Sequence, residues 1–162
     1  MPYISNSDYQ CKKFFNNGHV STIFCGAIKR TKTPDYYRLK LDLPDGDFLL
    51  IDYLLKSKDK AVILCHGLEG SSKSRYINTC ADYFHKNNFS VFAWNNRSCG
   101  GMMNPSPKLY HHGSFEDLEF VVNGILNWGF KEIYLVGYSL GGAQILSFLG
   151  HRIINSSIKA AV

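Results

Sequence analysis

The segment Gly137-Tyr138-Ser139-Leu140-Gly141 constrains the fold of this chain more than any other feature. It directly follows the apolar run 133–136, which is typical of a buried strand, and directly precedes a run compatible with a helix. A serine between two glycines at such a strand-to-helix corner lies on a sharp turn that exposes its hydroxyl. The first N–H groups of the helix are free to bind whatever the hydroxyl attacks. The segment therefore predicts a nucleophile at Ser139.

From residue 61 onward the chain alternates between strand and helix patterns. Short apolar runs are typical of strands buried on both faces of a parallel sheet, and they occur at 61–65, 89–94, 133–136 and 158–162. Apolar residues at helical spacing predict three helices, over 75–87, 118–125 and 140–149. Strand–helix–strand units of this kind connect through right-handed crossovers. We therefore expect an α/β fold, with a mostly parallel sheet and helices on both faces.

The first third of the chain has antiparallel character. Leu39, Leu41 and Leu43 alternate with polar residues, and Pro44-Asp45-Gly46 then favours a turn before a second apolar run at 48–55. This pattern predicts an N-terminal antiparallel hairpin ahead of the parallel strands.

The length of 162 residues allows one domain with a substantial core and is too short for two ordinary domains. We assign residues 1–35 to an N-terminal extension and residues 36–162 to the N-terminal part of a single α/β domain. Because the last residues follow the pattern of an interior strand, we expect this domain to be truncated at its C-terminus.

Two of the expected strand ends carry residues suited to one site. Ligands of parallel α/β sheets bind beyond the carboxyl ends of the strands, and both Ser139 and the pair His66-Gly67 fall at such ends. Attack by a serine creates an oxyanion that needs two N–H donors. We expect one donor at the backbone of Leu140 and the other at the backbone of Leu68. The neighbouring residues His66, Gly67, Gly137 and Gly141 are predicted to shape this site, the glycines by allowing close approach of the backbone.

The order of the motifs resembles that of the YheT-like branch of the α/β-hydrolases, and is similar also to the eukaryotic α/β-hydrolase-domain lipases and esterases. The resemblance covers about residues 14–162 and rests on five segments, which are His66-Gly67-Leu68-Glu69-Gly70-Ser71-Ser72, Arg75-Tyr76-Ile77, Asn96-Arg97-Ser98-Cys99-Gly100-Gly101, Tyr110-His111-His112-Gly113 and Gly137-Tyr138-Ser139-Leu140-Gly141-Gly142. It implies an α/β-hydrolase fold and hydrolysis of carboxylic esters through an acyl-enzyme on Ser139, without metal or cofactor.

The chain departs from the family pattern after the serine. The family triad runs in the order serine, acid, histidine, yet only 23 residues follow Ser139 and none of them is Asp or Glu. The single histidine among them, His151, would lie about 18 Å away along the same helix. We therefore expect the acid and the base to lie outside this chain, and this piece alone to be inactive.

Histidines before Ser139 offer alternative interpretations. His66 is either a base or, as we favour, a structural residue of the oxyanion loop. His112 and Asp117 form an H-x-x-x-x-D pattern that suits an acyltransferase-like protein. Asp117 is better explained by a capping box, in which Ser114 is the N-cap of a helix.

Other polar residues near the strand ends also have two interpretations. Glu69 either tunes the site or solvates its loop. Asn96 and Arg97 follow a strand end, so Arg97 either lines a pocket or acts as a structural clamp. Cys99 in its glycine-rich loop could be a reactive thiol, although no neighbouring cation or helix start supports this.

Composition limits the partners and the compartment. The net charge of +5 is spread along the chain, which argues against nucleic-acid binding. Five cysteines without a C-x-x-C pair suggest neither zinc nor a disulfide framework and fit a reducing compartment. No signal peptide and no apolar run of membrane-spanning length occur, so we predict a cytoplasmic protein and leave peripheral lipid contact open. The predicted function is a serine hydrolase of carboxylic, including lipid, esters; the alternative is a non-catalytic α/β-hydrolase scaffold.

Overall fold

The computed structural model describes residues 10–24, 32–151 and 155–162. The chain forms two compact units, Met1–Thr31 and Lys32–Val162, and each is described by itself. Cys25, one of the five cysteines, lies outside the described residues. The division at residue 35 stays a prediction.

The first unit contains a 3-10 turn, η1 (Lys13–Phe15), and a short helix, α1 (Gly18–Ile23). The side chain of Asn17 caps α1, because its oxygen accepts hydrogen bonds from the N–H groups of His19 at 2.9 Å and Val20 at 3.3 Å. Such a cap satisfies donors that have no partner within the helix.

The second unit is built on a six-stranded sheet with the order β1-β2-β4-β3-β5-β6. Its strands are β1 (Tyr37–Asp42), β2 (Phe48–Leu54), β3 (Lys60–Cys65), β4 (Ser90–Asn95), β5 (Glu132–Gly137) and β6 (Ile158–Ala161). Three helices connect them, namely α2 (Arg75–Lys86), α3 (Phe115–Leu126) and α4 (Leu140–His151). The strands from β3 onward pair in parallel, as the uniformly apolar runs predict.

The predicted N-terminal hairpin is confirmed. Strand β1 pairs antiparallel with β2, and β2 in turn pairs antiparallel with β4. The connecting turn is closed by a hydrogen bond from the Leu43 N–H to the backbone oxygen of Asp47 at 2.8 Å. Gly46 has φ +81° in this turn, a conformation that glycine adopts without steric cost.

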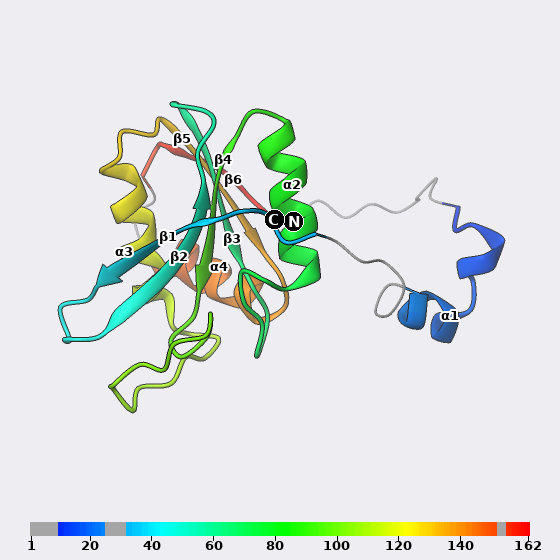
Figure 1. Ribbon diagram of the computed structural model, residues 1–162, viewed down its shortest axis with the longest axis horizontal. Coiled ribbons are helices and arrows are strands. Elements are labelled where there is room, and N and C mark those ends of the chain that lie inside the picture. Colours follow the sequence, from blue (N-terminus) through cyan, green and yellow to red (C-terminus); the bar gives the residue numbers. More distant parts are fainter. Residues whose placement is uncertain (1–9, 25–31, 152–154) are drawn as a thin grey trace. The chain divides into compact units, whose positions relative to one another are not determined.

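Helices cover both faces of the sheet, as expected (Figure 1). Helices α3 and α4 pack on one face, where Leu118 and Ile145 join the larger core cluster around Phe92. Helix α2 packs on the other face, where Ile77 and Ala81 join a second cluster. A sheet buried on both sides explains why the central strands have no alternation of apolar and polar residues.

The carboxyl ends of three central strands meet at one edge of the sheet. Cys65 at the end of β3 is in register with Trp94 on β4 and with Gly137 on β5. The loops that begin at residues 66, 96 and 138 therefore start side by side. This arrangement confirms that His66-Gly67 and Ser139 follow neighbouring strand ends.

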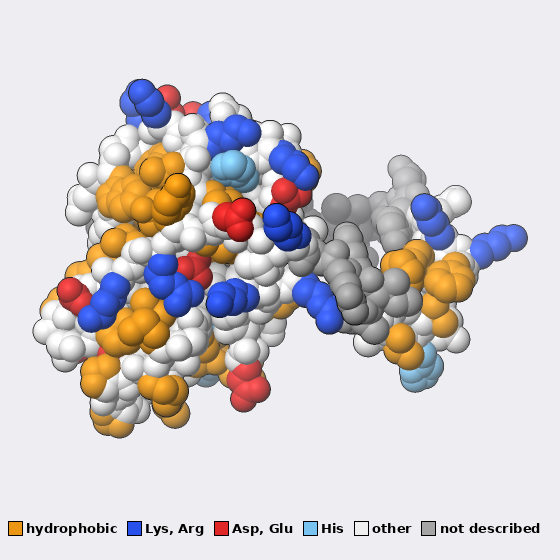
Figure 2. All heavy atoms as spheres, viewed as in Figure 1, with side chains coloured by type: hydrophobic (Ala, Val, Ile, Leu, Met, Phe, Trp, Pro, Cys, Tyr) orange, Lys and Arg blue, Asp and Glu red, His pale blue; other side chains and the backbone are white. Residues whose placement is uncertain are grey.

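Apolar and basic side chains are interleaved on the surface of the second unit (Figure 2). Exposed apolar residues include Tyr37, Leu55 and Trp128. Within the described ranges, no helix combines the length and the apolar character that crossing a bilayer requires. Peripheral lipid contact stays a prediction.

Candidate active site

Ser139 lies at the corner between β5 and α4, with an exposed side chain. Its φ is +53°, in the left-handed region that non-glycine residues rarely adopt. The turn is held by hydrogen bonds from the Gly141 N–H to the Tyr138 oxygen at 3.0 Å and from the Ala143 N–H to the Ser139 oxygen at 3.1 Å. A residue kept in this conformation costs free energy that the surrounding structure must offset. Such strain is common at functional sites.

The glycines beside the serine allow the corner to close. A Cβ on Gly137 would lie 2.6 Å from the Cα of Gly142, and a Cβ on Gly141 would lie 2.7 Å from the His66 oxygen and overlap the Cys65 carbonyl. Both positions therefore require glycine. The close approach at Gly141 places the first turn of α4 directly on the end of β3.

The loop after β3 lies against the serine. A Cβ built on Gly67 would be 3.4 Å from the Ser139 Cβ and 3.2 Å from the Tyr138 oxygen. Among the described residues, neither the Leu68 N–H nor the Leu140 N–H has a hydrogen-bond partner. These are the two amides that the sequence predicts as oxyanion donors, and both remain predictions in that role.

His66 is buried, and both of its ring nitrogens have hydrogen-bond partners. Its side chain has no exposed surface, its Nδ1–H donates to the Gly67 oxygen at 2.7 Å, and its Nε2 accepts from the Asn96 N–H at 3.1 Å. Burial lowers the pKa of the imidazole, which favours this neutral form. Because both ring nitrogens are occupied, the geometry supports the structural interpretation of His66 over its use as a base.

Comparison with known proteins identifies the family. Residues 60–162 match the family described as the alpha/beta hydrolase fold, and this match covers more than half of the chain. This chain belongs to the α/β-hydrolase family.

The sequence identity between this α/β-hydrolase and individual relatives is low. YheT of Escherichia coli K12, a candidate esterase, is 28% identical over 166 residues, which cover 99% of this chain and 48% of YheT. Human monoacylglycerol lipase ABHD2 is 28% identical over 151 residues, covering 86% of this chain and 35% of the lipase. The chain thus spans about half or less of the length of these curated relatives. Among solved structures, the Pyrococcus furiosus esterase Pf2001 superposes with a TM-score of 0.67 at 20% identity, covering 78% of this chain and 49% of the esterase, and so shares the fold.

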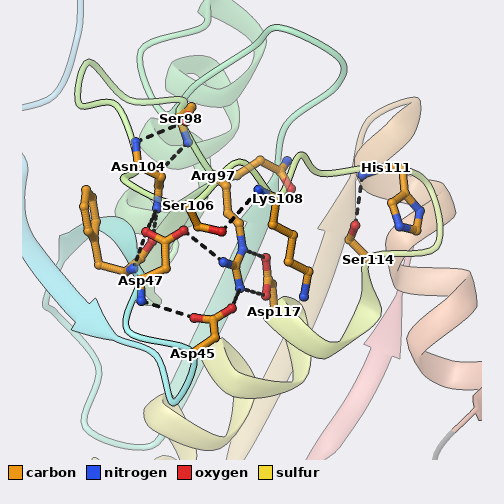
Figure 3. A network of polar contacts seen from close by, with 12 residues as sticks. Asp45, Asp47, Arg97, Ser98, Asn104, Ser106, Lys108, His111, Ser114 and Asp117 are labelled. Carbon is orange, nitrogen blue, oxygen red and sulfur yellow. Dashed lines mark hydrogen bonds and ion pairs between the residues drawn. The ribbon is translucent and has the colours of Figure 1, made fainter.

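Arg97 of this α/β-hydrolase acts as a clamp between three segments (Figure 3). Its side chain is only 2% exposed. The guanidinium contacts Asp117 on α3 twice, at 2.7 and 2.8 Å, and reaches Asp47 at 3.0 Å and Asp45 at 2.8 Å in the hairpin turn. The hydrogen bonds to Asp117 raise the pKa of Arg97, so the cation is strongly favoured. These ion pairs support the interpretation of Arg97 as a clamp, and the same residue also lines a cavity, so the two interpretations are compatible.

The capping box predicted for α3 is wrong. Ser114 is the N-cap residue, yet its side chain makes no cap hydrogen bond and instead accepts from the His111 N–H at 2.9 Å. Asp117 turns to Arg97 rather than back to the N-cap. The partner lies 20 residues earlier, and a buried cation offers a carboxylate a stronger interaction than a free N–H does.

The acyltransferase-like pattern finds no support in the contacts of Asp117. Both of its carboxylate oxygens are bound by Arg97, and the residue is buried. His112 is exposed. His151 on α4 stacks on Phe115, with ring centroids 4.8 Å apart. Among the described residues, no imidazole and no carboxylate forms a hydrogen bond with Ser139.

Glu69 lies in the loop after β3, and Cys99 lies in the connection after β4. They line a cavity of about 400 Å³ between the β3–α2 loop and the β4–α3 connection, together with Gly70, Ser71, Arg97, Ser98, Gly100, Leu109 and Tyr110. Burial raises the pKa of the Cys99 thiol, and an interaction with Tyr110 offsets this only in part. A thiol with a raised pKa is a weaker nucleophile at neutral pH, which argues against a reactive Cys99.

The sequence patterns assigned no individual role to two residues near this edge of the sheet, the buried Gln144 and the exposed Tyr76. Gln144 on α4 is fully buried. Its Nε2 donates to the side-chain oxygen of Asn96 at 2.8 Å and to the backbone oxygen of His111 at 3.3 Å. Tyr76 on α2 accepts a hydrogen bond from the Gly67 N–H at 2.9 Å, and its ring lies 4.7 Å from that of Tyr138. Only the three-dimensional arrangement brings these side chains to the site, because neither has a local sequence signal.

Proposed function

We propose that this protein hydrolyses carboxylic esters, with Ser139 as the nucleophile. One observation carries the proposal, namely an exposed serine with positive φ at the corner between β5 and α4, packed closely against Gly67. The names of two relatives, a candidate esterase and a monoacylglycerol lipase, support esters as the substrate class and include lipid esters within it.

The chemistry follows from the position of the serine. The Ser139 oxygen attacks the acyl carbon, and its proton passes through a histidine base to the leaving alcohol as the carbon–oxygen bond of the ester breaks. The Leu68 and Leu140 N–H groups bind the oxyanion of the tetrahedral intermediate. Water then cleaves the acyl-serine, which releases the carboxylic acid and restores the hydroxyl.

The base and its carboxylate are proposed to come from another part of the full-length protein. The hydrogen bonds at both ring nitrogens of His66 support a base other than this residue. The curated relatives are about two to three times as long as this chain, which leaves room for both residues.

Hydrolysis of p-nitrophenyl acetate, butyrate and octanoate by the full-length protein tests the proposal. We expect turnover that Ser139→Ala reduces at least about 1,000-fold, because the nucleophile is lost. Ser156→Ala is the matched control, since Ser156 is exposed on the loop before β6 and should retain full activity. Equal activity of Ser139→Ala and the parent would contradict the proposal. Folded parent protein without any turnover would favour the scaffold alternative.

A further inference from the structure

The loop formed by residues 67–70 has a distinctive pattern of hydrogen bonds. The Gly67 N–H donates to the Tyr76 hydroxyl at 2.9 Å, the Glu69 N–H to the Tyr110 hydroxyl at 3.0 Å, and the Gly70 N–H to the Gly67 oxygen at 3.0 Å. Of these four consecutive residues, only Leu68 has an N–H without a partner in the described part of the chain.

The peptide group between Gly67 and Leu68 is held in place through its carbonyl oxygen. The Gly67 carbonyl and the Leu68 N–H belong to one planar trans peptide and point in opposite directions. The Gly67 oxygen accepts from the His66 Nδ1–H at 2.7 Å and from the Gly70 N–H. The Leu68 N–H therefore points away from both of these donors.

A loop with glycines at positions 67 and 70 has little conformational preference of its own. Tyr76 and Tyr110 supply the restraint, one on each side of Leu68. Tyr76 also links the loop to the serine corner, because its ring lies 4.7 Å from that of Tyr138, the residue before Ser139. A Cβ on Gly70 would lie only 2.7 Å from the Tyr76 oxygen, which shows how closely the loop wraps this hydroxyl.

We propose that Tyr76 and Tyr110 are positioning residues, whose hydroxyls bind the two amides that flank Leu68 and leave the Leu68 N–H aimed at the substrate's oxyanion. This inference rests on the proposed function. Neither tyrosine touches the reacting atoms. A hydrogen-bond donor that is misplaced by a fraction of an ångström loses much of its effect on the transition state.

Replacing each tyrosine by phenylalanine tests the inference in the full-length protein. Tyr76→Phe and Tyr110→Phe remove the hydroxyl acceptors and keep the rings. Tyr83→Phe is the matched control, because it lies on the same helix as Tyr76, is 63% exposed, and its hydroxyl has no partner among the described residues. We expect kcat to fall about tenfold to a hundredfold in each test variant with little change in KM.

A second readout separates positioning from a merely structural role. Phenylboronic acid forms a tetrahedral adduct with a serine nucleophile, and its inhibition constant should rise in proportion to the fall in kcat/KM. The melting temperatures of the variants should stay within about 5 °C of the parent. Loss of thermal stability with unchanged kcat would overturn the inference, as would a rise in KM alone.

The outcomes also distinguish a failure of the positioning role from a failure of the proposed function. If hydrolysis depends on Ser139 and both phenylalanine variants retain the parent kcat, only the positioning role is wrong. If hydrolysis does not depend on Ser139, the proposed function and the positioning role are both wrong.

Discussion

Arg97 donates two hydrogen bonds to Asp117, one to each carboxylate oxygen, from Nε at 2.7 Å and from a terminal nitrogen at 2.8 Å. This contact joins the loop after β4 to the first turn of α3. The same guanidinium reaches Asp47 in the hairpin turn, so three segments that are distant in sequence depend on one cation (Figure 3). The loop that begins at residue 96 is thereby fixed at the edge of the sheet where Ser139 lies.

Replacing Arg97 should therefore destabilise the whole domain. Arg97→Met leaves the buried carboxylates of Asp47 and Asp117 without a cation, and we expect the free energy of unfolding to fall by about 3–5 kcal/mol. Urea denaturation measures this change. The control is Lys86→Met, which removes an exposed pair with Asp82 and should cost less than about 1 kcal/mol. Equal effects of the two substitutions would contradict the role of Arg97 as a clamp.

Gly141→Ala should disrupt the serine corner. The added Cβ would overlap the Cys65 carbonyl and approach the His66 oxygen, both of which are backbone groups at the end of β3. Because backbone cannot rotate aside as a side chain can, we expect a loss of at least about 1–3 kcal/mol in unfolding free energy. Reduced reaction with a fluorophosphonate should accompany it.

Gly150→Ala provides the control within the same helix. A Cβ at Gly150 has no atom within 4 Å, and alanine favours helix more than glycine does. This variant should be as stable as the parent or more so. A Gly141→Ala protein as stable and reactive as Gly150→Ala would show that the close approach to β3 is unimportant.

His66 should make stability depend on pH in mildly acidic solution. Burial lowers the imidazole pKa in the folded state, whereas the unfolded chain titrates near the ordinary value of about 6.5. Below this pH the unfolded state binds a proton that the folded state does not. The free energy of unfolding should therefore fall as pH decreases below about 6.5, by at most about 1.4 kcal/mol per pH unit, until the folded pKa is reached.

Urea denaturation at several pH values between 5 and 8 checks this expectation. His66→Gln should show a shallower slope than the parent below pH 6.5, whatever its stability at pH 8. His112→Gln serves as the control, because it replaces an exposed histidine and leaves the buried imidazole in place. An unchanged slope in His66→Gln would mean that this histidine does not govern the acid response.

Elements with strong local patterns could be predicted from the sequence. The uniformly apolar runs gave the central strands because burial on both faces removes alternation. The need for glycine at the serine corner was also predicted from the sequence, and in the structure Gly137 and Gly141 lie where no Cβ fits. The close contact of Gly137 is with Gly141 and Gly142 in the same turn, whereas that of Gly141 is with the end of β3. The residue types indicate the need for glycine at both positions, but not the partner of Gly141.

Side-chain partners that lie far apart in sequence could not be predicted. Asp117 has the spacing of a capping box, but its carboxylate binds the buried guanidinium of Arg97 instead of the N-cap N–H. Tyr76 resembles any aromatic residue in the first turn of an amphipathic helix. Its contact with Gly67 depends on how α2 packs against β3, which the pattern of α2 alone does not specify.

Mapping the site of fluorophosphonate attachment tests the central claim most directly. The full-length protein is treated with the reagent, digested and analysed by peptide mass spectrometry. A nucleophilic hydroxyl on the corner after β5 predicts a single adduct on Ser139, which is absent after Ser139→Ala and present after Ser156→Ala. An adduct on another residue, or a folded protein that acquires none, would contradict the claim.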